Sequence, residues 1–158
     1  CEAGQGEKAA PLLKEFIAAR RKRSPKDDPG FAGLLAQVAD DLLKCHQFAD
    51  AEPLLRECLA IREKKEPDAW TTFNTKSLLG GALLGQKKYA DADPLLLNGY
   101  EGLKSREKTI PPQGSTRIPE ALDRLIELYT ATNKPDEVKK WQAEREKYPN
   151  SGSSEEKK

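Results

Sequence analysis

The chain has 158 residues, a formal net charge of +1, and 34% charged but only 6% aromatic residues. This length suits one compact domain or a short run of repeats. The near-zero net charge argues against a nucleic-acid partner and against attraction to an anionic membrane. Many charges with few aromatic residues favour long amphipathic helices over a sheet-based core, so the sequence predicts an all-α fold.

The three cysteines are Cys1, Cys45 and Cys58. They form no CxxC motif and no Cys/His cluster with zinc spacing, and their odd number argues against a disulfide framework. We therefore expect a reducing, cytoplasmic location with no metal and no cofactor. No stretch approaches the ~20 consecutive apolar residues that span a bilayer, so no membrane insertion is expected.

One pattern recurs along the chain. Three segments share its register, at residues 8–20 (KAAPLLKEFIAAR), 50–62 (DAEPLLRECLAIR) and 91–97 (DADPLLL). Pro11, Pro53 and Pro94 are therefore equivalent, at spacings of 42 and 41 residues. Because a proline is tolerated in the first turn of a helix but not deep inside it, each proline marks a helix start.

A second helical pattern lies upstream of each of these prolines. Residues 34–51 match residues 75–92 in type, and residues 123–138 form a weaker third copy. Each unit is thus a helix A, a tight turn, a helix B and a loop. We expect helix B to begin near Phe48 and Tyr89, and Gly99 with Gly102 to kink or fray the second of these helices.

These units divide the chain into six segments. They are a truncated or flexible start, a lone helix B, repeat 1, repeat 2 with a long loop, a divergent terminal repeat 3 and a disordered tail, at residues 1–7, 8–30, 31–70, 71–116, 117–149 and 150–158. One helical hairpin cannot bury both of its faces. Stacked units share a core, which predicts a right-handed α-solenoid of antiparallel helix pairs.

The repeats resemble tetratricopeptide repeats in the long-period form found in kinesin light chains, over about residues 6–149. The positions that carry the resemblance are Phe48, Ala51, Pro53, Leu54, Leu59, Tyr89, Ala92, Pro94, Leu95 and Leu103. It implies a tetratricopeptide-repeat superhelix that acts as a non-catalytic scaffold or adaptor for a protein or peptide partner.

Residues 51–92 are also similar to the repeat tails of some large bacterial serine/threonine protein kinases. That similarity implies, as an alternative, a regulatory segment without phosphotransfer residues.

In such solenoids the concave groove is lined mainly by the A helices. The candidate groove residues, which face away from the apolar stripe, are Ala36, Asp40, Lys44, Asn74, Ser77, Gly81, Glu120, Asp123 and Glu127. Glu120, Asp123 and Glu127 are spaced to share one helix face, which predicts affinity for a basic or amine-bearing peptide. The alternative is an ordinary solvated helix face.

Several neighbouring residues have two interpretations. Trp70 either contacts a peptide beside Asn74 or covers the apolar side of a loop, and Gly80 favours close helix packing. Cys58 is expected in the core, and Cys45 beside His46 lacks the third group that a catalytic dyad needs.

The amino-terminal end leaves two further hypotheses. The lone first helix has no helix A of its own, which predicts an open apolar side and a capacity for self-association. Alternatively, Cys1 is the lipidated first residue of a processed bacterial lipoprotein, which would place the protein outside the cytoplasm.

Overall fold

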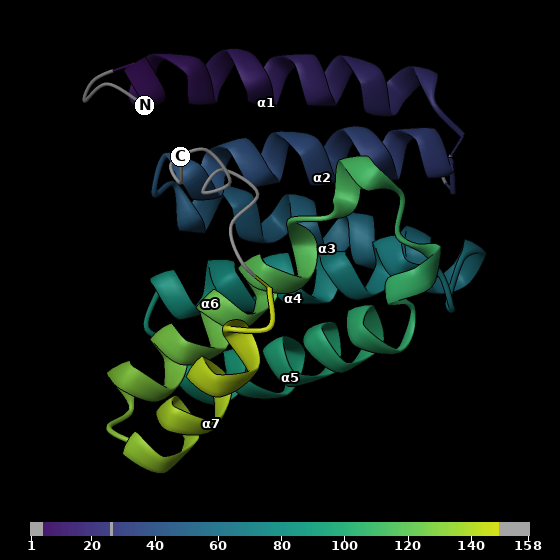
Figure 1. Cartoon of the computed structure of the whole chain (residues 1–158). Coiled ribbons are helices and arrows are strands. Elements are labelled where there is room, and N and C mark those ends of the chain that lie inside the picture. The colour runs from purple at the N-terminus through teal and green to yellow at the C-terminus, as the bar shows by residue number, and fades with distance from the viewer. Residues whose placement is uncertain (1–4, 26, 149–158) are drawn as a thin grey trace, which may run out of the picture.

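The computed structural model describes residues 5–25 and 27–148, and all regular structure in these ranges is helical (Figure 1). The helices are α1 Gln5–Arg23, α2 Pro29–Lys44, α3 Phe48–Lys65, α4 Trp70–Gly85, α5 Tyr89–Ser105, α6 Arg117–Ala131 and α7 Pro135–Arg145. Two short 3₁₀ helices, Glu107–Thr109 and Pro112–Gly114, lie in the long loop before α6. The predicted all-α fold class is confirmed, and the predicted tail at residues 150–158 lies outside the described residues.

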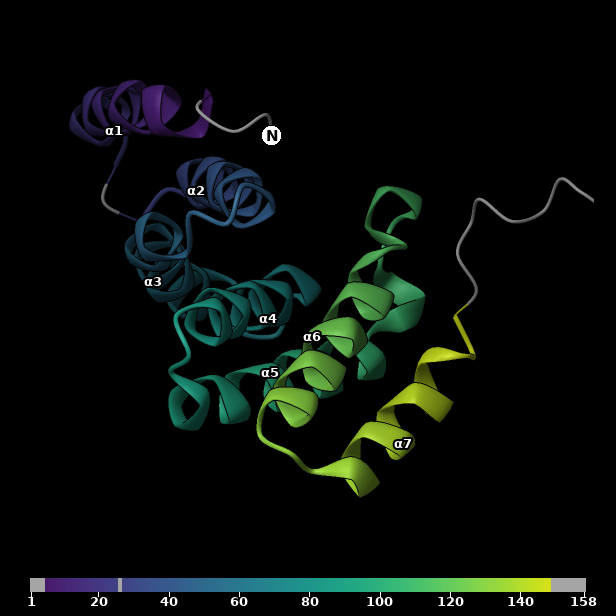
Figure 2. The ribbon, with the colours of Figure 1, turned by 90° about the vertical axis from the view of Figure 1, so that its left-hand side faces the viewer.

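The helices form an α-solenoid of stacked antiparallel pairs. Helices α2 and α3, α4 and α5, and α6 and α7 pack as hairpins, and α4 also packs against both α2 and α6. Figure 2 shows α2, α4 and α6 as one layer and α3, α5 and α7 as the other. The first helix, α1, extends the second layer and packs on α2.

The turns between the paired helices share one geometry. His46, Lys87 and Asn133 are the non-glycine residues with positive φ in the described chain, at 58°, 62° and 54°. Each follows the C-cap residue of an A helix, where a left-handed residue closes the last turn. As predicted, helices α3 and α5 begin at Phe48 and Tyr89, immediately after these turns.

Small residues let the two helices of repeat 2 approach closely. A Cβ atom on Gly99 would lie 2.7 Å from the backbone nitrogen of Ser77, and one on Gly80 would lie 2.6 Å from Cγ of Leu96. Ala92, on the same face of α5, is fully buried. The expected kink or fraying of this helix is wrong. Helix α5 is continuous through Gly99, because the lost helix propensity is offset by packing against α4.

Recurring ion pairs also join one repeat to the next. The Asp27–Lys64 pair, at 2.5 Å, recurs as Asp68–Arg106, at 3.4 Å. Both pairs connect an inter-repeat loop to the end of the next B helix. The same kind of ion pair therefore holds successive repeats together at two equivalent places.

Two glycine-to-alanine substitutions test whether the close approach of α4 and α5 depends on Gly99. Gly99→Ala should lower the free energy of unfolding by about 1–3 kcal/mol, because its Cβ meets backbone atoms that cannot turn aside. Gly33→Ala in α2 is the matched control, since a Cβ there has nothing within 4 Å. It should instead stabilise by about 0.5–1 kcal/mol. Urea unfolding measures both, and equal effects would contradict the role of Gly99.

Glu52 provides a pH-dependent contact between repeats. Its carboxylate accepts hydrogen bonds from Lys88 Nζ, Gln86 Nε2 and Arg56 Nε at 2.9, 2.8 and 2.9 Å. The bond from Lys88 is the main cause that lowers the pKa of Glu52 from 4.5 to about 2, against the opposing effect of burial.

Because this pKa is depressed on folding, its stabilisation is present above pH 4.5 and is lost as the pH falls toward 2. Glu52→Gln should therefore lower the free energy of unfolding by about 1–2 kcal/mol at neutral pH, since Lys88 is 46% exposed and solvent screens this pair, and the deficit should shrink over that window. Thermal unfolding across pH measures this. Asp68→Asn is the control, since its side chain is 92% exposed and its ion pair should contribute less than about 1 kcal/mol.

Candidate functional site

Two cavities lie along the layer formed by the A helices. The first, of about 360 Å³, is called the carboxyl-end cavity because it lies toward the carboxyl ends of α2 and α4. Its lining is Asp40, Leu43, Lys44, His46, Phe48, Gly81, Leu84, Gly85, Glu120, Arg124 and Glu127.

The second cavity, of about 190 Å³, is called the amino-end cavity because it lies toward the amino ends of α4 and α6. Its lining is Gly33, Ala36, Gln37, Asp40, Arg62, Trp70, Thr71, Asn74, Leu78, Pro111, Gln113, Gly114 and Arg117. Asp40 borders both cavities, so they are neighbours along α4, and the two together are called the groove.

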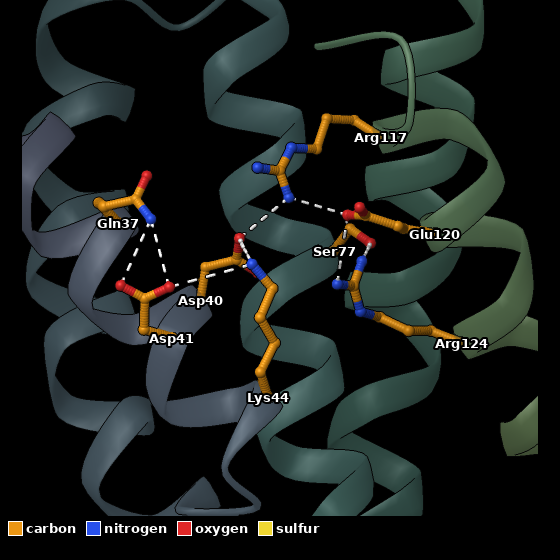
Figure 3. A network of polar contacts seen from close by, with 8 residues as sticks. All are labelled: Gln37, Asp40, Asp41, Lys44, Ser77, Arg117, Glu120 and Arg124. Atoms are coloured by element: carbon orange, nitrogen blue, oxygen red, sulfur yellow. Dashed lines mark hydrogen bonds and ion pairs between the residues drawn. The ribbon is translucent and has the colours of Figure 1, made fainter. Parts of the chain in front are cut away.

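A network of charged groups joins the first and third A helices (Figure 3). Asp40 of α2 is only 4% exposed, and its carboxylate accepts bonds from Lys44 Nζ and Arg117 Nη1, each at 3.1 Å. Arg117 also donates to Glu120 at 2.8 Å. Burial lowers the pKa of Arg117, but Glu120 and Asp40 outweigh it and leave that pKa raised. The guanidinium thus bridges α6 to α2 as a permanent cation.

Arg124 lies on the floor of the groove between α6 and α4. Its Nη1 donates to Ser77 Oγ at 3.1 Å, and its Nη2 lies 3.8 Å from Glu120. Burial is the main cause that lowers the pKa of Arg124, and Glu120 opposes it. The space for this long side chain exists because Gly81, which faces it, has no side chain.

The structure brings together most of the groove residues predicted from the sequence. The carboxyl-end cavity is lined by Asp40, Lys44, Gly81, Glu120 and Glu127, and the amino-end cavity by Ala36, Asp40 and Asn74. Ser77 is fully buried beneath Arg124.

Asp123 departs from the predicted acidic stripe. Its carboxylate accepts a bond from Arg145 Nε of α7 at 2.8 Å, and it lines neither cavity. At 100° per residue, it lies about 60° around the helix from Glu120, enough to turn it toward the other layer. Glu120 is paired with arginines, which leaves Glu127 as the acidic side chain of that stripe without a hydrogen bond or ion pair among the described residues.

Sequence reasoning missed the three arginines of the groove. Arg117 and Arg124 flank Glu120 at i−3 and i+4, and this ion-pair spacing was the signal that could have found them. Arg62 was hidden because it comes from the end of a B helix, α3. Its Nη1 donates to Thr71 O and to Thr75 Oγ1, both at 2.7 Å. It is 8% exposed and has no ion pair among the described residues.

Asn74 has an unpaired atom at the amino-end cavity. The residue is 7% exposed, and its buried Oδ1 has no hydrogen-bond partner among the described residues. A buried carbonyl without a partner is costly, at about 1–3 kcal/mol. Trp70 forms the adjacent wall and packs against the long loop, since a Cβ on Gly114 would lie 3.2 Å from its ring.

The two described cysteines differ. Cys58 is fully buried and donates to Ala32 O at 3.1 Å, and burial raises the pKa of its thiol, so its predicted core position is confirmed. Cys45 is disulfide-bonded, which is contrary to the expectation drawn from the odd number of cysteines. The cysteines therefore no longer argue for a reducing compartment.

The described residues contain neither a cluster suited to a metal ion nor a helix suited to a membrane. No group of three or more His, Cys, Asp or Glu side chains in residues 5–25 and 27–148 is arranged to hold a metal ion. No helix in the same ranges combines the length and the apolar character needed to cross a membrane.

The fold defines a helical-repeat protein, and the comparisons with known proteins agree. Residues 31–66 match the family model of the tetratricopeptide repeat. No curated protein matches the chain. Two solved structures of kinesin light chain tetratricopeptide-like repeats from Podosopora anserina, one of them a variant with a single substitution, have TM-scores of 0.65 and 0.67 at 18% identity.

Each of those matches covers 92% of this chain and 67% of the other. The chain therefore contains a tetratricopeptide repeat at residues 31–66 and has the fold of a tetratricopeptide-repeat solenoid over most of its length.

Proposed function

We propose that this chain is a non-catalytic protein-interaction scaffold that binds an extended segment of a partner protein in the groove along α4. The two neighbouring cavities, whose linings come from three repeats, are the observation that carries this proposal. The lining of the groove includes the exposed carboxylate of Glu127, which has no ion pair among the described residues. A basic side chain of the partner would pair with it.

The dimensions of the groove suit a short peptide. Trp70 and Gly85 mark its two ends on α4, fifteen residues apart, which is roughly 22 Å of helix. An extended chain rises about 3.3 Å per residue, so about seven residues of a partner would span both cavities. Several weak contacts, rather than one deep pocket, would supply the affinity.

The carboxyl-end cavity favours a basic side chain. Asp40 and Glu120 are already paired, whereas Glu127 is exposed and has no such partner among the described residues. The A helices also end here, and the negative ends of their dipoles favour a cation. A lysine or arginine of the partner would therefore lie beside Glu127.

Two variants on one helix test this proposal. Peptides selected from a random display library on the wild-type protein should contain a basic residue, and Glu127→Lys should weaken their binding about tenfold at low salt. Asp123→Lys is the matched control, because that side chain faces α7 and not the groove. Fluorescence polarisation measures both affinities. Equal losses in the two variants, or a selection that enriches no peptide, would contradict groove binding.

The alternative drawn from sequence similarity is that this chain is the regulatory repeat segment of a larger serine/threonine protein kinase. This alternative concerns the protein to which the segment belongs and leaves the groove as described. It predicts an encoded kinase domain upstream of this segment. The segment would then recruit a substrate or regulator through the same surface. The upstream coding sequence decides between the two.

Exposed apolar side chains on α1 favour self-association as a second candidate function. Leu12 and Phe16 are 67% and 53% exposed, whereas the neighbouring Ile17 is buried at 2%. Leu12→Lys with Phe16→Lys should shift a concentration-dependent dimer to monomer without changing the fold. Sedimentation equilibrium measures this, and a wild-type chain that stays monomeric at high concentration would exclude it.

A further inference from the structure

We infer that the carboxyl-end cavity binds the partner's basic side chain in a pH-dependent way, because protonation of His46 weakens the binding of a cation beside Glu127. This inference rests on the proposed function and adds the regulation of that same site. His46 is the one histidine of the chain, and it lines this cavity. Histidine is the side chain that ordinarily changes its charge between pH 5 and 8. The cavity therefore holds a basic partner in neutral solution and releases it as the pH falls.

The other charged groups that line the cavity leave one negative charge for a ligand. They are three carboxylates and two cations, and most of them are paired (Figure 3). Lys44 Nζ lies 3.1 Å from Asp40 Oδ2, and this pair belongs to α2. Arg124 Nη2 lies 3.8 Å from Glu120 Oε2 on α6. Glu127, also on α6, is the lining carboxylate that has no ion pair among the described residues.

His46 changes the net charge of this lining. With a neutral imidazole the titratable groups that line the cavity sum to −1, and a protonated imidazole brings the sum to zero. His46 has no ion pair among the described residues, so no carboxylate there neutralises its positive charge. Helix α4 adds no titratable group, since it contributes Gly81, Leu84 and Gly85. Arg117 adds positive charge only from the side of the amino-end cavity.

The fold holds His46 at the wall of the cavity. The residue follows the C-cap of α2 at a φ of 58°, and its backbone N–H donates to Leu43 O at 2.9 Å. Its ring packs against the edge of Phe48, with ring centres 5.6 Å apart and planes at 74°. Phe48 in turn lies where Gly85 has no side chain. Backbone geometry and ring packing thus keep the imidazole beside the site of the cation.

A proton on His46 and a cation of the partner compete for the same negative potential. Helices α2 and α4 end at Lys44 and Gly85, beside this cavity, and the carboxyl end of a helix favours a positive charge. His46 follows α2 and Glu127 belongs to α6, so the two lie on either side of α4 (Figure 2). A cation bound between them is repelled by an imidazolium and not by a neutral imidazole.

The repeats themselves supply suitable substitutions for His46. Lys87 and Asn133 occupy the equivalent turn in repeats 2 and 3, with φ values of 62° and 54°. His46→Lys and His46→Asn therefore introduce residues that this turn already accepts, one always charged in the neutral range and one never charged. Neither Lys87 nor Asn133 lines the groove, which makes these positions available for controls.

The experiment compares peptide affinities at about pH 8 and about pH 5.5, where ordinary carboxylates stay ionised. Peptides enriched from the random library at pH 8 are resynthesised without histidine and with blocked termini, and fluorescence polarisation at low salt gives each Kd. The wild-type affinity should fall about threefold to fivefold at the lower pH. His46→Asn should keep the high affinity at both pH values, and His46→Lys should keep the low affinity at both.

A relocated histidine is the matched control. The double variant His46→Asn with Asn133→His has the composition of the wild-type chain, but its histidine lies outside both cavities. It should bind with the same affinity at both pH values. The single histidine also gives a direct signal. At about pH 6.5, saturating peptide should move the imidazole Cε1–H resonance of the wild-type protein toward its neutral position, because linkage is reciprocal.

The outcomes separate this inference from the proposed function. Peptides that bind the wild-type protein equally at both pH values would overturn the role of His46 and leave groove binding intact. A pH dependence that persists in His46→Asn, or in the relocated variant, would also overturn it. A selection that enriches no peptide would contradict the proposed function, and the pH dependence with it.

Discussion

The arrangement of this solenoid depends on how closely the backbones of its paired helices approach. In repeat 2 that approach is set by positions without side chains, where Gly80 of α4 meets Leu96 and Gly99 of α5 meets the backbone of Ser77. A single extra carbon there would push the helices apart. Since α4 packs against α2, α5 and α6, its placement also sets the spacing of the three A helices, and with it the width of the groove.

The groove is held in shape by charges as well as by packing. Asp40 and Arg117 belong to the first and third repeats, yet their side chains meet across α4 at 3.1 Å. Buried ion pairs add little net stability, but they fix geometry because a displaced charge would be left unpaired. The same network occupies most of the charged groups on the groove floor. Among the described residues that line the groove, Glu127 and Arg62 have no ion pair.

Sequence periodicity predicted the fold because helix starts, turns and apolar stripes are local features. The site was predicted only in part. A residue's position in a helix determines which way its side chain points, but not which side chains of other helices it contacts. Asp123 shares an approximate face with Glu120, but a rotation of about 60° turns it toward α7. Arg62 was missed because a long side chain on a B helix reaches the A-helix surface. That Asn74 Oδ1 has no partner among the described residues is a property of packing, which no spacing rule shows.

The direction of the groove follows from the repeat itself. Every A helix runs the same way, because each is separated from the next by one antiparallel partner, so their dipoles align instead of cancelling. The amino ends meet where Arg62 and Arg117 lie, and the carboxyl ends meet near Glu127. Side-chain charge and backbone dipole therefore have the same sign at each end. A further repeat would widen such a groove without reversing its polarity, so a partner segment would meet the same electrostatic direction along the whole stack.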